Sequence, residues 1–400
     1  MTQNRPLNVL IVGAGLSGLA AAIAIAISGH SVTILESTKL LTEVGAGLQV
    51  TPNASRLLQT WGLDAEALSL AAEPTVLTVH RYSNGKVLAK ERDFDRNIRR
   101  KYNAPFIDMH RGDLQRIMYA KAISLGVRLE LGIRVTRVEH TGAGPRVALV
   151  SGESRTADLV VGADGLWSRC RESLMGRSDP PLPTGDLAYR IVLDTAQIAD
   201  PELKEWIMKP EVHFWIGPYA HAVGYSLRAG KMYNIVLLCP DDLPEQASRS
   251  AASTEEMRKM FADWDPILTR FLDCVDDVDK WKLMHREEMH SWTNPEKDIV
   301  LIGDSCHPML PYLAQGANSS IEDGGVLGRL MSYVHDREQV PWAIGLFEQL
   351  RKPRSEQIVR ETFLQRAAFH MPDGQPQKQR DSLFASQLGQ DVSSGFPSRW

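Results

Sequence analysis

The chain has 400 residues, of which 43% are hydrophobic, and a formal net charge of −4. Such a chain buries a large core, which we expect to be shared by two closely packed domains. The weakly negative charge argues against nucleic acid or an anionic membrane as a partner, and the four cysteines include no CxxC pair typical of zinc sites. Apolar runs fall short of the roughly 18 residues that a membrane-spanning helix needs. We expect a cytoplasmic protein.

A glycine-rich turn follows the first apolar run of the chain. Residues Leu7–Val12 predict a buried strand. The next six residues contain three glycines at GxGxxG spacing: Gly13, Gly15 and Gly18. Gly13 and Gly15 allow backbone amides to approach a pyrophosphate, and Gly18 allows a helix to pack closely on a strand. This turn is a candidate phosphate-binding loop.

The residues after the turn complete a nucleotide-binding pattern. An alanine-rich stretch, Leu19–Ser28, predicts a helix, and Ser31–Leu35 predicts a second strand that ends at Glu36. A carboxylate at that strand end is suited to accept hydrogen bonds from a ribose diol. The pattern fits either NAD(P) or FAD, and an ordinary βαβ unit without a ligand remains the alternative.

Four later segments carry further motifs. They read GAGLQVTPNA (45–54), HRGDL (110–114), GADGLWSR (162–169) and GDSCHPMLPYLAQGAN (303–318). The last two each follow a short apolar run that predicts a strand, so an acid–glycine turn comes directly after a buried strand in both cases. Two prolines make the fourth segment rigid, and its final glycine leads into a predicted helix.

The region from Gly176 to about Pro295 has a different character, with alternating apolar runs typical of an antiparallel or mixed sheet. Arg190 lies inside one such run, where burial of a guanidinium is costly without a partner. His221 and Tyr225 are four residues apart in another run, so they share one face of a strand. A structural ion pair for Arg190 and a structural hydrogen bond for His221 are the alternatives to catalytic roles.

These motifs together resemble the single-component FAD-dependent aromatic hydroxylases, in particular their salicylate hydroxylase-like branch. The resemblance rests on the N-terminal GxGxxG, on GADG followed by Ser168 and Arg171, and on the late GDSCHPMLPYLAQGAN segment. It extends over about Leu7–Gln365 and implies an α/β fold. A Rossmann-like FAD-binding βαβ domain would be interleaved with a substrate domain built on a mixed sheet, with helices at the C-terminal end.

The resemblance implies how FAD would be held. Asp304 would bind the ribityl chain, Arg111 the pyrophosphate or adjoining ribose, and Pro311 would lie against the flavin edge. The helix that follows would point its N-terminus at the flavin pyrimidine. The full set of predicted cofactor-binding residues is Gly13, Gly15, Gly18, Glu36, Gly47, Arg111, Asp164, Asp304, Pro311, Gly316 and Ala317. Asp164 is expected to act mainly through local structure.

The resemblance also implies a substrate site. Arg190 would hold a phenolate over the flavin, and the pair His221 and Tyr225 would bind and help deprotonate a ring hydroxyl. Tyr312 stands where some relatives carry a histidine and others a tyrosine, and we predict that Tyr312 and Gln49 contact the substrate. No metal site is expected, since His285, His290 and His307 have no ligand spacing.

The implied domain division is discontinuous. We assign 1–75, 100–175 and 296–330 to the FAD-binding domain and 76–99 and 176–295 to the substrate-binding sheet domain. We assign 331–370 to C-terminal helices and 371–400 to a polar tail.

The implied function is hydroxylation of a phenolic aromatic compound, with dioxygen and NADPH or NADH as co-substrates, through a flavin C4a-hydroperoxide. The alternatives are an FAD-dependent epoxidase or oxygenase of an indole or other heteroaromatic in secondary metabolism, and a non-hydroxylating FAD-binding oxidoreductase. We expect a monomer or homodimer.

Overall fold

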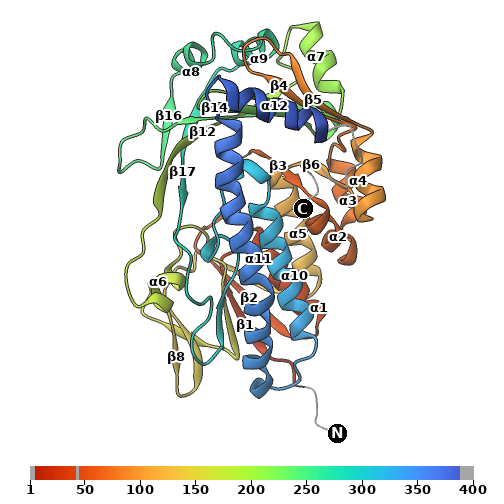
Figure 1. The fold of residues 1–400 in the computed structure, drawn as a ribbon. Coiled ribbons are helices and arrows are strands. Elements are labelled where there is room, and N and C mark those ends of the chain that lie inside the picture. Colours follow the sequence, from red (N-terminus) through yellow and green to blue (C-terminus); the bar gives the residue numbers. More distant parts are fainter. Residues whose placement is uncertain (1–4, 42–44, 388–400) are drawn as a thin grey trace.

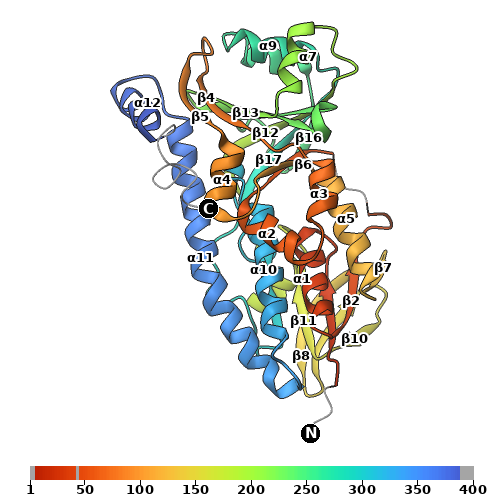
Figure 2. The ribbon, with the colours of Figure 1, turned by 90° about the vertical axis from the view of Figure 1, so that its right-hand side faces the viewer.

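The computed structural model describes residues 5–41 and 45–387. Two large sheets lie at opposite ends of the molecule, and the long helix α11 (Val340–Phe369) runs from one to the other (Figure 1). The view turned by 90° shows α10 (Gly316–Met331) between α11 and α1 (Leu16–Ile27) (Figure 2). Within the described residues, no helix has the length and apolar character required to cross a membrane.

The first sheet is parallel, with the strand order β18–β11–β1–β2–β7. The central strand β1 is apolar on both faces, and Val9 and Ile11 are fully buried, as expected for a parallel sheet covered by helices. A three-stranded sheet, β10–β9–β8, lies beside it. The strands are β1 (Asn8–Val12), β2 (Ser31–Glu36), β7 (Arg128–Leu131), β8 (Val135–Thr141), β9 (Gly144–Leu149), β10 (Ser154–Thr156), β11 (Leu159–Gly162) and β18 (Ile299–Leu301).

The second sheet is mixed and has the order β16–β17–β12–β15–β14–β13–β4–β5. All neighbours are antiparallel except β13 and β4, which are parallel. One face packs on α7, α8 and α9, and the other turns toward the first sheet. The strands are β4 (Val76–Arg81), β5 (Val87–Arg92), β12 (Leu182–Asp194), β13 (Glu211–Gly217), β14 (Ala220–Leu227), β15 (Met232–Pro240), β16 (Arg249–Ala252) and β17 (Val278–His285).

The remaining elements connect and cover these sheets. The short strands β3 and β6 pair antiparallel between them. The elements are β3 (Gly47–Val50), β6 (Ile107–His110), α2 (Pro52–Thr60), α3 (Asp64–Leu70), α4 (Phe94–Tyr102), α5 (Arg111–Ser124), α6 (Arg169–Met175), α7 (Pro201–Met208), α8 (Thr254–Met260) and α9 (Pro266–Asp273).

The C-terminal segment differs from the predicted polar tail. Helix α12 (Gln375–Gln387) forms within it and lies beside β5 (Figure 1). Phe384 is buried against Phe369 of α11, with ring centroids 6.3 Å apart, and Arg380 donates to the carbonyl of Ala368. One phenylalanine and one arginine in a polar stretch thus suffice to dock a helix. The rest of the predicted tail, 388–400, lies outside the described residues.

Small residues allow α10 to pack directly on α1. An added Cβ at Gly328 would lie 2.2 Å from Cβ of Ala24, and one at Gly324 would lie 2.5 Å from the backbone nitrogen of Ala21. The alanine-rich face of α1 therefore meets a glycine face of α10. This contact brings α10 to the end of the first sheet from which the glycine-rich turn emerges.

A buried carboxylate fixes the segment that connects β18 to α10. Asp323 in α10 is fully buried and accepts hydrogen bonds from the backbone nitrogen of Gly303 at 2.8 Å and from Nε of Arg351 at 2.8 Å. His307 Nε2 lies 2.6 Å from the same carboxylate. Although burial opposes ionisation, His307 and Arg351 hold the pKa of Asp323 at about 2. Asp323 thus joins β18, α10 and α11.

We predict that Gly328→Ala lowers the thermal unfolding midpoint. The added methyl group has no space against Ala24, and overpacking of this kind costs about 1–3 kcal/mol. Gly142→Ala is the control, because no atom lies within 4 Å of its added Cβ. Equal midpoints for the two variants would contradict close packing of α1 on α10.

We predict that Asp323→Asn lowers the free energy of unfolding by roughly 3 kcal/mol, at the lower end of the range for breaking a buried ion pair. We expect the lower end because Glu322, 3.3 Å from Arg351, still balances the charge of that arginine. The folded pKa of Asp323 lies below its unfolded value of about 3.9. Its contribution is therefore complete above pH ~4 and is lost as the pH falls toward ~2. Denaturant unfolding at neutral and acidic pH measures the free energy of unfolding of wild type and variant. A difference between the two that does not become smaller in acid would contradict the prediction.

Candidate active site

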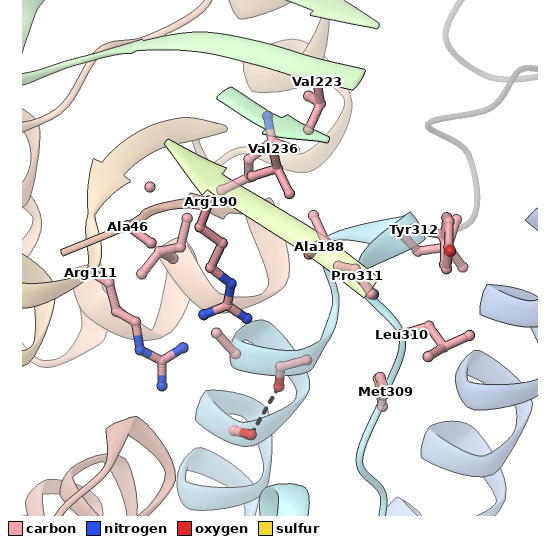
Figure 3. A pocket seen from close by; sticks show the side chains of 18 of the residues that line it. Ala46, Arg111, Ala188, Arg190, Val223, Val236, Met309, Leu310, Pro311 and Tyr312 are labelled. Carbon is pink, nitrogen blue, oxygen red and sulfur yellow. Dashed lines mark hydrogen bonds between the residues drawn. The ribbon is translucent and has the colours of Figure 1, made fainter. Parts of the chain in front are cut away.

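A cavity of about 370 Å³ lies between the two sheets. Its lining comes from the glycine-rich turn, β3, the inner face of the second sheet and the segment between β18 and α10. Figure 3 shows Arg111 and Arg190 extending from different elements into the same space, with Pro311 and Tyr312 on one side. Segments separated by about 300 residues in sequence therefore form one site.

The glycine-rich turn has the predicted geometry. Gly13 has a φ of +104°, and an added Cβ would lie 2.4 Å from the carbonyl oxygen of Ala163. An added Cβ at Gly18 would lie 2.0 Å from the carbonyl oxygen of Gly13. These two glycines are required by the packing of the turn itself. Gly15 differs, since nothing lies within 4 Å of its added Cβ and the residue lines the cavity.

The two acidic residues beside this turn do different things. Glu36, at the end of β2, accepts a hydrogen bond from the backbone nitrogen of Ala14 at 2.8 Å, which places its carboxylate next to the turn. Asp164 accepts from Ser168 Oγ at 2.6 Å and from the backbone nitrogens of Arg169 and Cys170. Asp164 thus holds the start of α6, and it is not part of the cavity lining among the described residues. This geometry agrees with the expectation that Asp164 acts mainly through local structure, and its predicted contact with the cofactor stays a prediction.

The other predicted cofactor contacts come together around the cavity. Arg111, Asp304, Pro311, Gly316 and Ala317 all line it. The side chain of Asp304 faces the cavity, and the surrounding protein shields it from bulk solvent. This desolvation raises the pKa of its carboxyl, whereas His307 and Arg111 lower that pKa in part. Gly47 also lines the cavity, but an added Cβ there would lie 2.7 Å from Tyr225 and Asn234. The close approach of the second sheet thus requires a glycine at that position, and its contact with the cofactor stays a prediction.

The shape of the cavity fits a flat, extended cofactor. No atom lies within 4 Å of an added Cβ at Gly15, Gly165 or Gly316, although all three line the cavity. At these three glycines no side chain covers the backbone, so a phosphate chain or a ring system has room to contact it. The N-terminus of α10 begins at Gly316 and offers positive potential at the same surface. With Glu36, Arg111 and Asp304 around this bare backbone, the residues fit FAD.

The second sheet contributes one face to the cavity. His221, Val223 and Tyr225 of β14 alternate with residues that face the other side, as the two-residue period predicts. Ala188 and Arg190 of β12 lie on the same face. His221 and Tyr225 are thus together in one cavity, as expected from the sequence.

The structure places Arg190 in the cavity lining, where the resemblance led us to expect it to face a ligand. Its side chain is exposed to the cavity, and its guanidinium carbon lies 4.9 Å from the ring centroid of Trp281 on the neighbouring strand β17. The aromatic ring orients the side chain without enclosing it. The cation thus lies in the cavity lining, where a ligand can contact it.

Burial lowers the pKa of one β14 side chain and raises that of the other, and both shifts favour the neutral form. Desolvation lowers the pKa of His221 well below its usual value, and the neighbouring His370 lowers it further. Desolvation raises the pKa of Tyr225 well above its usual value, with Asp108 adding to the effect and Arg190 opposing it. At neutral pH His221 is an uncharged imidazole, and Tyr225 is a neutral phenol that can donate a hydrogen bond.

The predicted substrate contacts Gln49 and Tyr312 both line the cavity but have polar partners in the protein. Gln49 Nε2 donates to Asp108 Oδ1 at 3.0 Å. Asp108 is buried, and desolvation raises the pKa of its carboxyl. The hydroxyl of Tyr312 donates to Asp186. Tyr312 therefore offers its ring to the cavity and directs its hydroxyl to the second sheet.

Sequence reasoning missed several residues of this site. Asp108, Asp186, Arg366 and His370 come from β6, β12 and α11, and the sequence around each carries no motif. Asp186 was the easiest of them to predict from the sequence, because it is an acid at the start of the apolar run that contains Arg190. The sequence around His370 gave no indication of a role in the site, because its residue pattern predicts an ordinary amphipathic surface helix that ends there.

Comparison with known proteins agrees with this site. The family described as "FAD binding domain" matches residues 6–362. The chain is 47% identical over 398 residues to the FAD-dependent monooxygenase OpS4 of Beauveria bassiana (strain ARSEF 2860), covering 99% of this chain and 92% of that protein. It is 31% identical over 367 residues to 3-hydroxybenzoate 6-hydroxylase of Klebsiella oxytoca, covering 92% and 89%.

A solved structure supports the fold. The crystal structure of Klebsiella pneumoniae HpxO complexed with FAD and uric acid has a TM-score of 0.85 at 20% identity, covering 100% of this chain and 98% of that chain. The predicted α/β fold, FAD as cofactor and monooxygenase activity are confirmed by these matches. The chain belongs to the FAD-binding-domain family and is a FAD-dependent monooxygenase.

Proposed function

We propose that this monooxygenase hydroxylates a phenolic ring held between the second sheet and the segment around Pro311. The observation that carries the proposal is the convergence of Arg190, His221 and Tyr225 on one cavity face. A cation, a neutral imidazole and a phenol are the groups that bind a ring hydroxyl and remove its proton. The relative named 3-hydroxybenzoate 6-hydroxylase acts, by its name, on such a ring.

Each part of the chain has a distinct task in this proposal. The segments 76–99 and 176–295 bind the substrate, and the segments 1–75, 100–175 and 296–330 bind FAD. When bound and reduced by NADPH or NADH, FAD supplies the activated oxygen. The protein residues around it bind the ring, remove its hydroxyl proton and keep water away.

The ring hydroxyl is the point at which the side chains act. Neutral His221 accepts the hydroxyl proton, and the cationic Arg190 stabilises the phenolate that results. Tyr225 remains protonated, because burial raises its pKa, and donates a hydrogen bond to the phenolate oxygen. The deprotonated ring carries more electron density and reacts faster with an electrophilic oxygen. Apolar cavity residues such as Val223 and Leu238 exclude water from the site.

The first experiment is the oxidation of NADPH and NADH by the FAD-loaded protein against a panel of ring compounds. The panel contains salicylate, 3- and 4-hydroxybenzoate, larger acylated phenols and an indole, with hydrogen peroxide and product measured in parallel. We expect one phenol to accelerate oxidation and to gain an oxygen atom with little peroxide. Turnover of the indole alone would replace phenol hydroxylation with oxidation of a heteroaromatic ring.

We predict that Arg190→Gln raises the Kd of the phenol identified by the panel about 10- to 100-fold. A hydrogen bond to a charged group contributes about 1.5–3 kcal/mol, and the neutral amide cannot balance a phenolate. Titration of the flavin absorbance of the oxidised enzyme measures this Kd without turnover. Arg177→Gln is the matched control, because Arg177 is an exposed arginine outside the cavity. Unchanged affinity in Arg190→Gln would exclude Arg190 as the phenolate partner.

A further inference from the structure

A line of buried polar side chains leads from the cavity to the C-terminal end of α11. His221 Nδ1 lies 2.8 Å from His370 Nε2. His370 Nδ1 in turn lies 3.9 Å from Asp186 Oδ2. His221 and Asp186 are 2% exposed and His370 9%, so all three groups are shielded from bulk solvent. Strands β14 and β12 contribute His221 and Asp186, and His370 directly follows α11.

The carboxylate of Asp186 at the far end of the line is firmly held. Arg366 donates to both of its oxygens, from Nε at 2.5 Å and from Nη2 at 2.6 Å. Tyr312 donates its hydroxyl to Oδ2 as well. A bidentate guanidinium and a phenol hydroxyl bind the carboxylate of Asp186 and fix its orientation. The negative charge therefore has a defined position beside His370.

This charge determines which nitrogen of each imidazole carries the proton. A lone pair on His370 Nδ1 would face the Asp186 carboxylate and be repelled, so the proton resides on Nδ1. His370 Nε2 then carries the lone pair and accepts a hydrogen bond from His221 Nδ1–H. Both histidines are neutral at neutral pH, since burial lowers the pKa of His370 to about 4 and that of His221 well below its usual value.

The consequence appears at the cavity. With its proton on Nδ1, His221 has a lone pair on Nε2, and this atom has no hydrogen-bond partner within the described part of the chain. His221 lines the cavity, and its ring is held between the rings of Tyr312 and Phe369, with centroids 5.2 Å and 5.1 Å away. The imidazole thus presents a fixed acceptor to whatever occupies the cavity.

We propose that His370 and Asp186 are positioning residues that make His221 a base and carry its proton away from the substrate. The O–H bond of the ring hydroxyl breaks and an N–H bond forms at His221 Nε2. His221 Nδ1 passes its proton to His370 Nε2, and the resulting His370 imidazolium is stabilised by the Asp186 carboxylate. The role of the ring hydroxyl rests on the proposed function, whereas the tautomer of His221 does not.

The tautomer is tested first, without any substrate. Long-range proton–nitrogen correlation spectra of the FAD-loaded protein with isotope-labelled histidine distinguish Nδ1–H from Nε2–H imidazoles, and His221→Gln assigns the signal. We expect His221 as the neutral Nδ1–H tautomer at neutral pH and a mixture of tautomers in His370→Leu, which leaves the Asp186–Arg366 ion pair in place. A neutral Nε2–H tautomer or a charged His221 in the wild type would overturn the proposal.

The relay is then tested with the phenol from the panel and with a nitro-substituted analogue that is already a phenolate in solution. We expect His370→Leu to lower kcat/KM for the phenol about 10- to 100-fold, the range for partners that fix a histidine tautomer. The phenolate band in the ultraviolet difference spectrum of the oxidised complex should weaken as well. The nitro analogue needs no base and should retain its kcat/KM.

The control is His213→Gln, which breaks another buried histidine pair. His213 Nδ1 lies 3.0 Å from His80 Nε2, and neither residue lines the cavity. This variant should retain wild-type kcat/KM with both compounds. Equal losses for phenol and nitro analogue in His370→Leu would show a structural defect and overturn the relay. If the tautomer is as expected but no phenol in the panel reacts, the proposed function fails and the arrangement of His221, His370 and Asp186 stands.

Discussion

The carboxylate of Asp323 is the point on which the geometry of the site depends. It lies in α10, accepts a hydrogen bond from Gly303, two residues after the end of β18, and pairs with Arg351 of α11. The chain between these contacts, from Gly303 to Gly316, is anchored at its start by Gly303 and His307 and at its end by α10 itself. Asp304, Pro311 and Tyr312 all belong to this segment. Their positions around the cavity thus follow from one buried charge and its donors.

The same arrangement explains why the chain tolerates a charge at full burial. A lone carboxylate without donors would not remain ionised there, and its pKa would rise with desolvation. Arg351 and His307 reverse that tendency for Asp323. Asp186, on the other side of the cavity, is also buried and accepts hydrogen bonds from Arg366 and Tyr312. Both anchors draw their arginine from α11, so this helix holds the two halves of the site in register.

The sequence was informative wherever chemistry depends on local order along the chain. The glycine spacing of Gly13, Gly15 and Gly18 could be interpreted directly, because a strand, a turn and a helix are consecutive. The shared face of His221 and Tyr225 followed from the two-residue period of a strand. The nucleotide-binding unit could therefore be predicted from chain order, whereas FAD as the cofactor was implied by the resemblance of the combined motifs to the aromatic hydroxylases.

Features that depend on distant partners could not be predicted in this way. Asp186 and Arg366 are 180 residues apart, and neither has a neighbour in sequence that indicates the pairing. For Arg190 the sequence left a structural ion pair as the alternative, and the structure places the side chain in the cavity lining beside Trp281. The close approach of Gly47 to Tyr225 and Asn234 of the second sheet likewise has no signal in its local motif.

Tyr312 connects these observations. Its backbone follows Pro311 in the segment that Asp323 anchors, its ring lines the cavity, and its hydroxyl binds Asp186. A histidine here would present a second titratable group to the cavity. Tyr312 instead donates its hydroxyl to Asp186 and presents only its aromatic ring to the cavity. Burial and Asp186 raise the pKa of this hydroxyl far above neutral pH, so it does not act as a base. In the proposed function His221 therefore removes the proton, and the Asp186 carboxylate that orients His221 through His370 is held partly by the residue next to Pro311.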